Sequence, residues 1–370
     1  MKRYTQLAIP FLIAAACTGG DQRSLTAPEF RVASAGQTTS SIAVTDLGTL
    51  GGTTSEAYSL NTPSVGNRLL IVGRSFDKAG TQHAAYWYVN MATGARQAGA
   101  LPAPAGDVQS WAAGVNQSEA VVGGTLNTVG GLGVPVEWAA SSWSPTFLNL
   151  NGGNYGTAQG INGTAQIVGY FGDFSRSDLI YGALWEGNAL TQITGFGGRV
   201  TQAFDVNSAG VAVGGSQYLG SEQYHAFVWT KPGPVVPLPD AGYSGSRAWA
   251  INDAGVIVGD VYTVGTNGSS RAVRWLPSAT IGGAYTIEDL GLANSDALDI
   301  NNAGEIVGQY NPLSSTIKAF YWLNGNLKDL PLLTPIRGGG ARSINESGDV
   351  AGWNRLPNSY QHAVLWTHVR

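Results

Sequence analysis

The chain is a succession of short apolar runs separated by glycine, asparagine and proline. One stretch shows the pattern clearly, with four runs at residues 248–251, 256–258, 271–275 and 287–291. Runs of β-branched and apolar residues bounded by turn-forming residues are typical of β-strands. This stretch is therefore predicted to form four short antiparallel strands.

Three residue types recur along the chain at intervals of about 45 residues. The first is tryptophan, at Trp87, Trp138, Trp185, Trp229, Trp275, Trp322 and Trp366. The second is asparagine, at Asn61, Asn116, Asn162, Asn207, Asn252, Asn301 and Asn345. The third is glycine, at Gly73, Gly123, Gly169, Gly214, Gly259, Gly308 and Gly352. The chain is therefore a tandem array of seven repeats.

The repeat asparagine predicts a tight turn between the first two strands of each repeat. An Asn side chain can hydrogen-bond its own backbone two residues on, and a following Gly can adopt a left-handed conformation. Asn-x-x-Gly occurs in four repeats, for example at Asn207 and Gly210. The second and third repeats carry Glu119 and Ala165 in place of this Gly. We expect their hairpins to be looser.

The first strand of each repeat has one face of small residues. Alanine stands four residues before every repeat asparagine, at Ala57, Ala112, Ala158, Ala203, Ala248, Ala297 and Ala341. Small side chains suit strands crowded around a common axis, while the tryptophans fill the space between stacked sheets. Four antiparallel strands in about 45 residues are typical of a β-propeller blade. The predicted fold is an all-β, seven-bladed β-propeller.

The ends of the repeat array favour a closed ring over an open solenoid. Residues 42–48 match a fourth strand with no preceding three, and the last repeat stops soon after its third strand at Trp366. An N-terminal strand that completes the last blade would close the ring and remove the open sheet edge. The propeller is expected to span residues 41–370.

The repeats resemble the HAF-repeat family of predicted extracellular bacterial proteins. The resemblance rests on His225-Ala-Phe-Val-Trp229, on the Asp-Leu-Gly-Thr-Leu-Gly-Gly string at residues 46–52, and on residues 251–255. Four repeats replace the histidine of the first motif. The resemblance implies an exported repeat protein, and it brings no catalytic site to this chain.

The N-terminus also predicts export. Lys2 and Arg3 precede an apolar stretch too short to span a bilayer, which indicates a signal peptide over residues 1–16. Residues 14–17 resemble a lipoprotein box, in which Cys17 would be lipidated; the alternative is ordinary cleavage that leaves Cys17 free. We favour lipidation, because Cys17 is the only cysteine and lies at the predicted cut. Residues 17–40 would then tether the domain to the outer membrane or cell surface.

Composition narrows the possible functions. Charged residues make up 12% of the chain, against about a quarter in typical proteins, and 52 residues are glycine. This profile suits an exported, turn-rich β protein. The net charge of −4 lacks the basic signature of nucleic-acid binding. No cofactor or metal motif is present, and we expect a monomer that meets the membrane only through its lipid.

The titratable residues favour a structural interpretation over catalysis. His83, His225 and His362 share one repeat position, as architectural residues do. Asp205 and Asp299 lie on the small face of the innermost strand and are candidates for the central channel. They would bind a cation or act as acid and base there; the alternative is that channel water solvates them.

Aromatic residues after the second strand of several repeats predict a binding face. Loops on a rigid scaffold often carry recognition, and exposed rings stack on sugars or anchor proteins. The candidate ligand-binding residues are Tyr170, Tyr218, Tyr262, Tyr310 and Trp353. The favoured function is a non-catalytic scaffold that binds a glycan or a protein. The alternatives are an exported polysaccharide hydrolase or lyase, and a purely structural envelope protein.

Overall fold

The computed structural model describes residues 42–370, apart from 64–65, 128–130, 141, 176–177, 266–269, 279–283, 313–315, 335–336 and 368. The predicted signal peptide, Cys17 and the tether lie outside the described residues. Within the described part, all regular secondary structure longer than a turn is β-strand.

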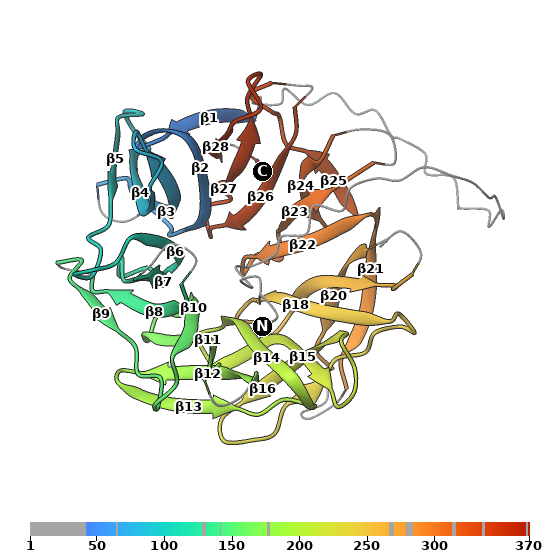
Figure 1. The fold of residues 1–370 in the computed structure, drawn as a ribbon. Helices are drawn as coiled ribbons and strands as arrows, with labels where there is room; N and C mark the ends of the chain where they lie inside the picture. Colours follow the sequence, from blue (N-terminus) through green and yellow to red (C-terminus); the bar gives the residue numbers. More distant parts are fainter. Residues whose placement is uncertain are drawn as a thin grey trace.

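Each repeat forms a meander of antiparallel strands (Figure 1). The first repeat holds β2 (Gly51–Leu60), β3 (Arg68–Asp77), β4 (Gln82–Asn90) and β5 (Arg96–Ala100), and the second holds β6 (Gln109–Val115), β7 (Val121–Leu126), β8 (Gly133–Trp138) and β9 (Pro145–Phe147). The third holds β10 (Tyr155–Ile161), β11 (Gln166–Gly172), β12 (Ile180–Glu186) and β13 (Ala189–Ile193), and the fourth holds β14 (Gly197–Val206), β15 (Val211–Tyr218), β16 (Tyr224–Thr230) and β17 (Val236–Pro237).

The remaining repeats follow the same order. The fifth holds β18 (Gly245–Ile251), β19 (Ile257–Tyr262), β20 (Ser270–Leu276) and β21 (Thr286–Ala293), and the sixth holds β22 (Ser295–Ile300), β23 (Ile306–Tyr310), β24 (Lys318–Leu323) and β25 (Asn326–Asp329). The seventh supplies β26 (Gly339–Ile344), β27 (Val350–Arg355) and β28 (Gln361–Thr367), and β1 (Ala43–Gly48) from the other end of the described chain pairs antiparallel with β28.

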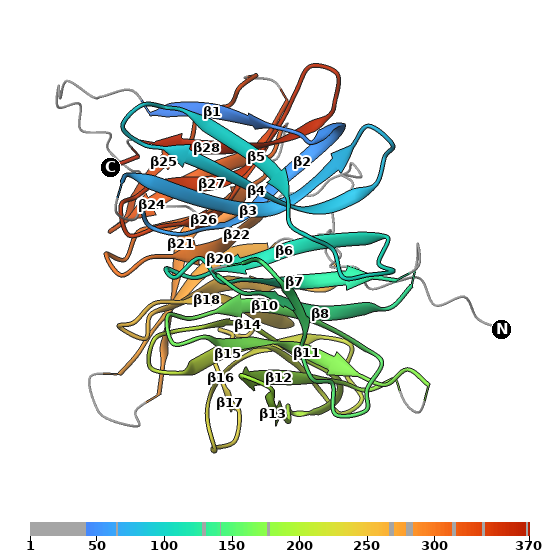
Figure 2. The same cartoon turned by 90° about the vertical axis from the view of Figure 1, so that its left-hand side faces the viewer.

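The sheets are arranged around a central axis, with the first strand of each repeat innermost (Figure 1). The side view shows the sheets stacked face to face (Figure 2). This is the architecture of a β-propeller. The first and last repeats are neighbours, because β2 contacts β26, β27 and β28.

The repeat tryptophans lie in the core between sheets, as expected. All seven are buried. In four repeats the indole Nε1 donates to a carbonyl of the segment that enters the same repeat: Trp138 to Pro102, Trp185 to Asn149, Trp275 to Pro239 and Trp366 to Pro331, at 2.6–2.7 Å. Each of these tryptophans therefore packs the core and also fixes the path of the chain between repeats.

The repeat glycines are required by a close approach of two strands. Each innermost strand carries a β-bulge just after its alanine, for example between Ala203 and Asp205. The backbone there presses on the second strand, so that a methyl group added at Gly214 would lie 1.9 Å from the carbonyl oxygen of Gln202. The same clash, at 1.9–2.1 Å, would arise at all seven positions. Only glycine fits.

The repeat asparagines make the predicted turns. The side-chain oxygen of Asn207 accepts from the backbone N–H groups of Ala209 and Val211, at 3.1 and 3.0 Å. The expectation of looser hairpins in the second and third repeats is wrong. Glu119 and Ala165 adopt φ values of 66° and 60° and keep the turn hydrogen bond at 3.0 and 3.1 Å. The strain is local, in the left-handed backbone of these two residues.

The same asparagines also connect each repeat to the next. The side-chain amide donates to the main-chain carbonyl of the following asparagine at 2.9–3.1 Å, from Asn116 to Asn162, Asn162 to Asn207, Asn207 to Asn252, Asn252 to Asn301, Asn301 to Asn345 and Asn345 to Asn61. Asn61 is the exception, because its buried amide has no partner among the described residues. A carboxylate could accept in the turn but could not donate across the interface, which explains why the position holds Asn.

Candidate functional site

Two positions, one beside the repeat alanine and one beside the repeat glycine, bring charged residues together near the axis. One precedes the inner-strand alanine and the other follows the repeat glycine, and they face each other across the first two strands. Glu56 pairs with Arg74, Arg247 with Asp260, and Asp296 with Gln309. With Arg342 on β26 they form what we call the axial cluster: Glu56, Arg74, Arg247, Asp260, Asp296, Gln309 and Arg342. It lies toward the ends of the second strands.

Glu56 anchors one side of the axial cluster and joins the first repeat to the seventh. It is buried, and its carboxylate accepts from Arg342 Nη2 at 2.8 Å, from Arg74 Nη2 at 3.1 Å and from the Tyr58 hydroxyl at 3.1 Å. Burial acts to raise the pKa of Glu56, but Arg342 and Arg74 outweigh it and the pKa is lowered. Glu56 is therefore ionised and held by two cations.

Asp260 and Asp296 form the opposite side, and neither is held by a guanidinium. Asp260 is buried and accepts from Trp249 Nε1 at 2.6 Å, while Asp296 accepts from Gln309 Nε2 at 3.3 Å. Burial raises the pKa of Asp260 to about 7, against the lowering effect of Arg247 and with a further rise from Asp296. Burial also raises the pKa of Asp296. This pair can hold a proton near neutral pH.

Arg247 lies close enough to both carboxylates to act on their pKa values, and three aromatic rings lie near its guanidinium. Its guanidinium carbon lies 5.0 Å from the ring centre of Tyr262, 5.7 Å from that of Trp249 and 5.9 Å from that of Tyr224. Among the described residues it forms no ion pair within 4.0 Å, unlike Arg74 and Arg342. Arg247 thus keeps donors that no carboxylate of the described chain occupies.

Several polar atoms around the axial cluster are buried without a hydrogen-bond partner in the described structure. They are Trp353 Nε1, Trp111 Nε1, Arg74 Nε and Gln309 Oε1. Trp353 is 6% exposed, and its Nε1 and Gln309 Oε1 both face the Cα of Gly340, where a methyl group would lie 2.7 and 2.6 Å from them. An unpaired buried polar group costs about 1–3 kcal/mol. Unpaired groups of this kind call for water or a ligand.

Asp205 and Asp299, the predicted channel carboxylates, each hydrogen-bond the backbone of the next repeat. Asp205 accepts from the backbone N–H groups of Val206 and Ile251 at 2.8 and 2.9 Å. Asp299 accepts in the same way from Ile300 and Ile344, each at 2.8 Å. Burial raises the pKa of both carboxyls, to about 7 for Asp299, which also feels the charge of Asp205. Both are half-buried, and backbone N–H groups rather than water alone satisfy them.

The aromatic candidates lie at the ends of second strands rather than in the following loops, and they differ in exposure. Tyr170 and Trp353 are buried within β11 and β27, so neither ring offers a free face. Tyr262 and Tyr310 are half-buried, and the Tyr310 hydroxyl donates to Asp329 at 2.7 Å. Tyr218 is 40% exposed and stacks on Phe196. The expectation of a set of exposed rings therefore holds for Tyr218 alone among the five.

The three repeat histidines each face an aspartate, as an architectural role requires. The His83 Nε2–Asp77 and His362 Nδ1–Asp46 distances are 3.0 Å, and the His225 Nδ1–Asp240 distance is 3.6 Å. Arg271 and Lys318 occupy the same position in their repeats and pair with Asp289 and Asp329. A basic side chain on the third strand that contacts an aspartate is thus a recurring feature, and for His362, Arg271 and Lys318 the aspartate lies on the adjacent outer strand.

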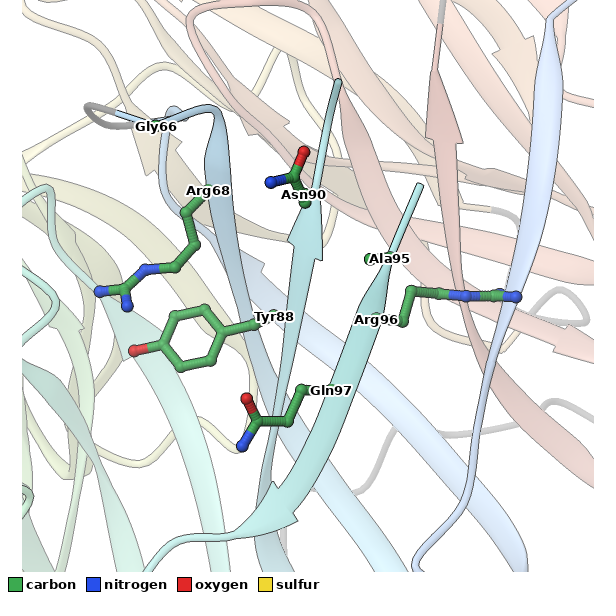
Figure 3. A pocket seen from close by; sticks show the side chains of 7 residues that line it. All are labelled: Gly66, Arg68, Tyr88, Asn90, Ala95, Arg96 and Gln97. Carbon is green, nitrogen blue, oxygen red and sulfur yellow. The ribbon is translucent and has the colours of Figure 1, made fainter. Parts of the chain in front are cut away.

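A pocket of about 520 Å³ lies at the outer part of the first repeat (Figure 3). Its lining residues are Gly66, Arg68, Tyr88, Asn90, Ala95, Arg96 and Gln97. The strongest polar groups there are already engaged: Arg68 and the Tyr88 hydroxyl bind Glu119, and Arg96 donates to the carbonyl of Asp46. This pocket offers less unsatisfied hydrogen-bonding capacity than the axial cluster.

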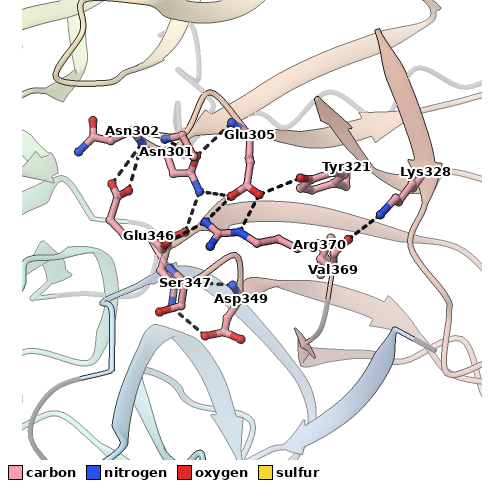
Figure 4. A network of polar contacts seen from close by, with 12 residues as sticks. Asn301, Asn302, Glu305, Tyr321, Lys328, Glu346, Ser347, Asp349, Val369 and Arg370 are labelled. Carbon is pink, nitrogen blue, oxygen red and sulfur yellow. Dashed lines mark hydrogen bonds and ion pairs between the residues drawn. The ribbon is translucent and has the colours of Figure 1, made fainter. Parts of the chain in front are cut away.

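A second polar network ties the last residue of the chain to two hairpins (Figure 4). The buried carboxylate of Glu305 accepts from the Arg370 guanidinium at 2.7 and 2.8 Å and from the Tyr321 hydroxyl at 2.8 Å. Arg370 also donates to the carbonyl of Glu346. These bonds join the hairpins of the sixth and seventh repeats, so the network is structural.

The axial cluster was not among the predicted site residues, although the sequence contained a signal. Its members stand directly beside the repeat alanine or glycine, where other repeats carry Thr157, Gly124 or Gly215. A charge in a position that is otherwise small or neutral would have singled them out. Within the described residues, no group of three or more potential ligands is placed to hold a metal ion. No helix in that part of the chain is long and apolar enough to span a bilayer.

The chain is similar in fold to several solved structures. The β-propeller domain of the Trilobed protease from Pyrococcus furiosus is 8% identical, with a TM-score of 0.50, over 85% of this chain and 93% of that one. An acylaminoacyl peptidase from Pyrococcus horikoshii (10% identity, TM-score 0.49) and a sialidase from Trypanosoma rangeli (10%, TM-score 0.47) are matched over 85% and 86% of this chain. The chain spans about half the length of these two, 51% and 54%.

No protein-family model matches the chain, and no curated protein does. The Pyrococcus furiosus domain is described as having an open velcro topology, whereas here β1 pairs with β28. At such low identity the likeness concerns the fold alone. The chain is an all-β protein with the β-propeller fold.

Proposed function

We propose that this protein is a closed, seven-bladed β-propeller that binds a glycan at the axial cluster without transforming it. Closure is supported by three contacts between the first and last repeats. β1 pairs with β28, the Asn345 amide donates to the Asn61 carbonyl, and Arg342 pairs with Glu56. Each of the seven four-stranded units would then be one blade.

The observation that carries the binding proposal is the set of unsatisfied donors around the axis. Trp353 Nε1, Trp111 Nε1 and Arg74 Nε have no acceptor among the described residues. Sugar hydroxyls supply such acceptors, and a few well-placed polar groups give a ligand site its orientation and specificity. The burial of Tyr170 and Trp353 favours a proposed site at the axis over one on the loops.

The proposal includes export and membrane attachment. The HAF-repeat resemblance and the N-terminal pattern support a protein that is displayed at the bacterial outer membrane or cell surface through lipidated Cys17. Incorporation of a labelled fatty acid into the protein tests this, with Cys17→Ser as the control variant. Label that persists in the variant would contradict attachment at Cys17.

A polysaccharide hydrolase or lyase is the second candidate. The observation in its favour is the Asp260–Asp296 pair, since an acid whose pKa lies near 7 suits general acid–base catalysis. Release of reducing ends or unsaturated products from envelope polysaccharides, abolished by Asp260→Asn, would establish this function in place of simple binding.

The deciding experiment is binding of the purified protein to a panel of neutral and acidic oligosaccharides. Trp353→Phe removes the unpaired indole donor, and Arg274→Gln serves as a control on an outer strand, where Arg274 pairs with Glu288. We expect saturable binding that Trp353→Phe weakens about tenfold, the loss of one good hydrogen bond, with Arg274→Gln unchanged. Failure to bind any member of the panel would overturn the proposal.

A further inference from the structure

We infer that the glycan bound at the axial cluster is acidic, and that its carboxylate pairs with the guanidinium of Arg247. This inference rests on the proposed function and narrows it to one chemical class of saccharide. It is carried by the position of Arg247, which is the one guanidinium of the axial cluster without a carboxylate in ion-pairing distance.

The other two arginines of the axial cluster are already paired with a carboxylate. Arg74 and Arg342 share the Glu56 carboxylate, with N–O distances of 3.1 and 2.8 Å. The single carboxylate therefore offsets part of their combined positive charge, and the hydrogen bonds to it are directed at a protein group. A ligand carboxylate would have to share these two guanidinium groups with Glu56, which is buried. Arg247, whose guanidinium hydrogen-bonds the side chain of Tyr262, would not have to be shared with a carboxylate of the described chain.

The surroundings of Arg247 favour the binding of a planar anion. The rings of Tyr262, Trp249 and Tyr224 lie within 6 Å of its guanidinium carbon and stabilise the cation. A guanidinium presents a rigid fork of N–H donors that matches a carboxylate with two parallel hydrogen bonds. The aromatic rings limit the directions from which a ligand can approach.

The two neighbouring carboxyl groups do not compete for that fork. Asp260 accepts from the Trp249 indole and Asp296 from the Gln309 amide, both neutral donors. Burial favours the protonated form of each, with the pKa of Asp260 at about 7. Protonation of Asp260 lowers the repulsion that an incoming carboxylate would otherwise meet. An acidic ligand should therefore bind with uptake of a proton.

A second, independent feature points to a ligand on the adjacent repeats. Within the described part of the chain, Trp353 Nε1 is buried without an acceptor and Gln309 Oε1 is buried without a donor, and both face Gly340. Gln309 also binds Asp296, so this unpaired set is continuous with the Arg247 side of the axial cluster. A saccharide hydroxyl both donates and accepts, and a small rotation of these side chains would let it satisfy the two atoms.

The test is a calorimetric titration of the full-length protein with galacturonate, glucuronate and N-acetylneuraminate oligosaccharides. Each acidic probe is matched with its methyl ester, which keeps the sugar and removes the charge. We expect at least one acidic probe to bind about tenfold or more tightly than its ester. Arg247→Lys, which keeps the charge but loses the fork, and Arg247→Gln should abolish that preference, whereas Arg274→Gln should keep it.

The outcomes separate this inference from the function on which it rests. Binding of neutral probes that Trp353→Phe weakens, with no preference for acids, would retain the glycan site and overturn the acidic ligand. Tighter binding of glucosamine oligomers, whose amines would pair with Asp260 and Asp296, would also overturn it. No binding by any probe would overturn both proposals. Thermal unfolding of each variant identifies loss of fold.

Discussion

The side-chain amide of Asn345 donates to the main-chain carbonyl of Asn61 at 3.0 Å, although 284 positions separate them in the sequence. The same bond links the other neighbouring repeats, except that Asn61 lacks the corresponding partner. The chain thus contains its own control, an asparagine at the same repeat position that begins a longer loop, accepts from the Leu70 N–H, and does not make the connection among the described residues.

Asn207→Asp should destabilise the protein by about 1–2 kcal/mol more than Asn61→Asp. Both variants keep an oxygen that can accept in the turn, and both bury a carboxylate. Only Asn207→Asp removes a bond to the next repeat, at present 3.1 Å from the carbonyl of Asn252. Denaturant unfolding measures the difference. Equal losses would mean that the bonds between repeats contribute nothing to stability.

Two adjacent glycines on β15 should differ greatly in how much stability they lose on substitution by alanine. A methyl group at Gly214 would lie 1.9 Å from the backbone oxygen of Gln202, while one at Gly215 would lie 3.2 Å from the movable ring of Tyr224. We expect Gly214→Ala to cost about 3 kcal/mol or more and Gly215→Ala less than about 1 kcal/mol. Thermal unfolding of the two variants tests the prediction. A tolerated Gly214→Ala would show that the bulge can relax.

Ala165→Gly should stabilise the protein by about 0.5–1 kcal/mol. Ala165 has a φ of 60°, where a side chain is strained and glycine is not. Ala209→Gly is the matched control, because Ala209 lies in the equivalent hairpin at an ordinary φ and should lose stability through added chain entropy. The thermal unfolding midpoint of each variant measures the effect. A midpoint that shifts in the same direction in both variants would contradict the strain argument.

The Asp260–Asp296 pair should make stability fall as the pH rises toward 7. The folded pKa of Asp260, about 7, lies above its ordinary value of 3.8, so folding binds a proton between these values. This contribution is complete below the ordinary value and is lost as the pH rises through the folded one. The groups facing Asp260 are Arg247, Asp296 and Trp249.

Asp260→Asn, which can still accept from Trp249, removes this dependence. The unfolding free energy of the variant minus that of the unsubstituted protein should therefore rise between about pH 5 and about pH 8. Urea unfolding at several pH values measures the effect. A constant difference across this range would mean that Asp260 titrates with an ordinary pKa in the folded protein.

Much of the fold could be predicted because the repeat residues each have a single physical task. Tryptophan fills the space between sheets, asparagine makes a turn, and alanine allows crowding at the axis, so their spacing predicts strands and sheets. The recurring glycine could be found in the sequence, but the reason for it could not, because a β-bulge does not change the residue composition of a strand. Glu119 and Ala165 show that a turn persists without the residue that favours it.

The candidate site was harder to predict because it is built by departures from the repeat. Glu56 meets Arg342 across 286 positions, a pairing that spacing within one repeat cannot reveal. The exposure of aromatic residues was also misjudged, since Tyr170 and Trp353 fall inside strands that run further than their apolar pattern suggests. Burial at the axis depends on several repeats at once.

The pairing of β1 with β28 has a consequence for biosynthesis. Val44 lies opposite Trp366. The first described strand to be synthesised can therefore pair only after the last described strand, β28, has been made. During synthesis β1 has an unpaired edge, and closing so long a loop is slow compared with forming any hairpin. We expect the intermediate repeats to assemble first, leaving an incomplete array whose two exposed edges invite pairing with other chains until the C-terminal strand arrives.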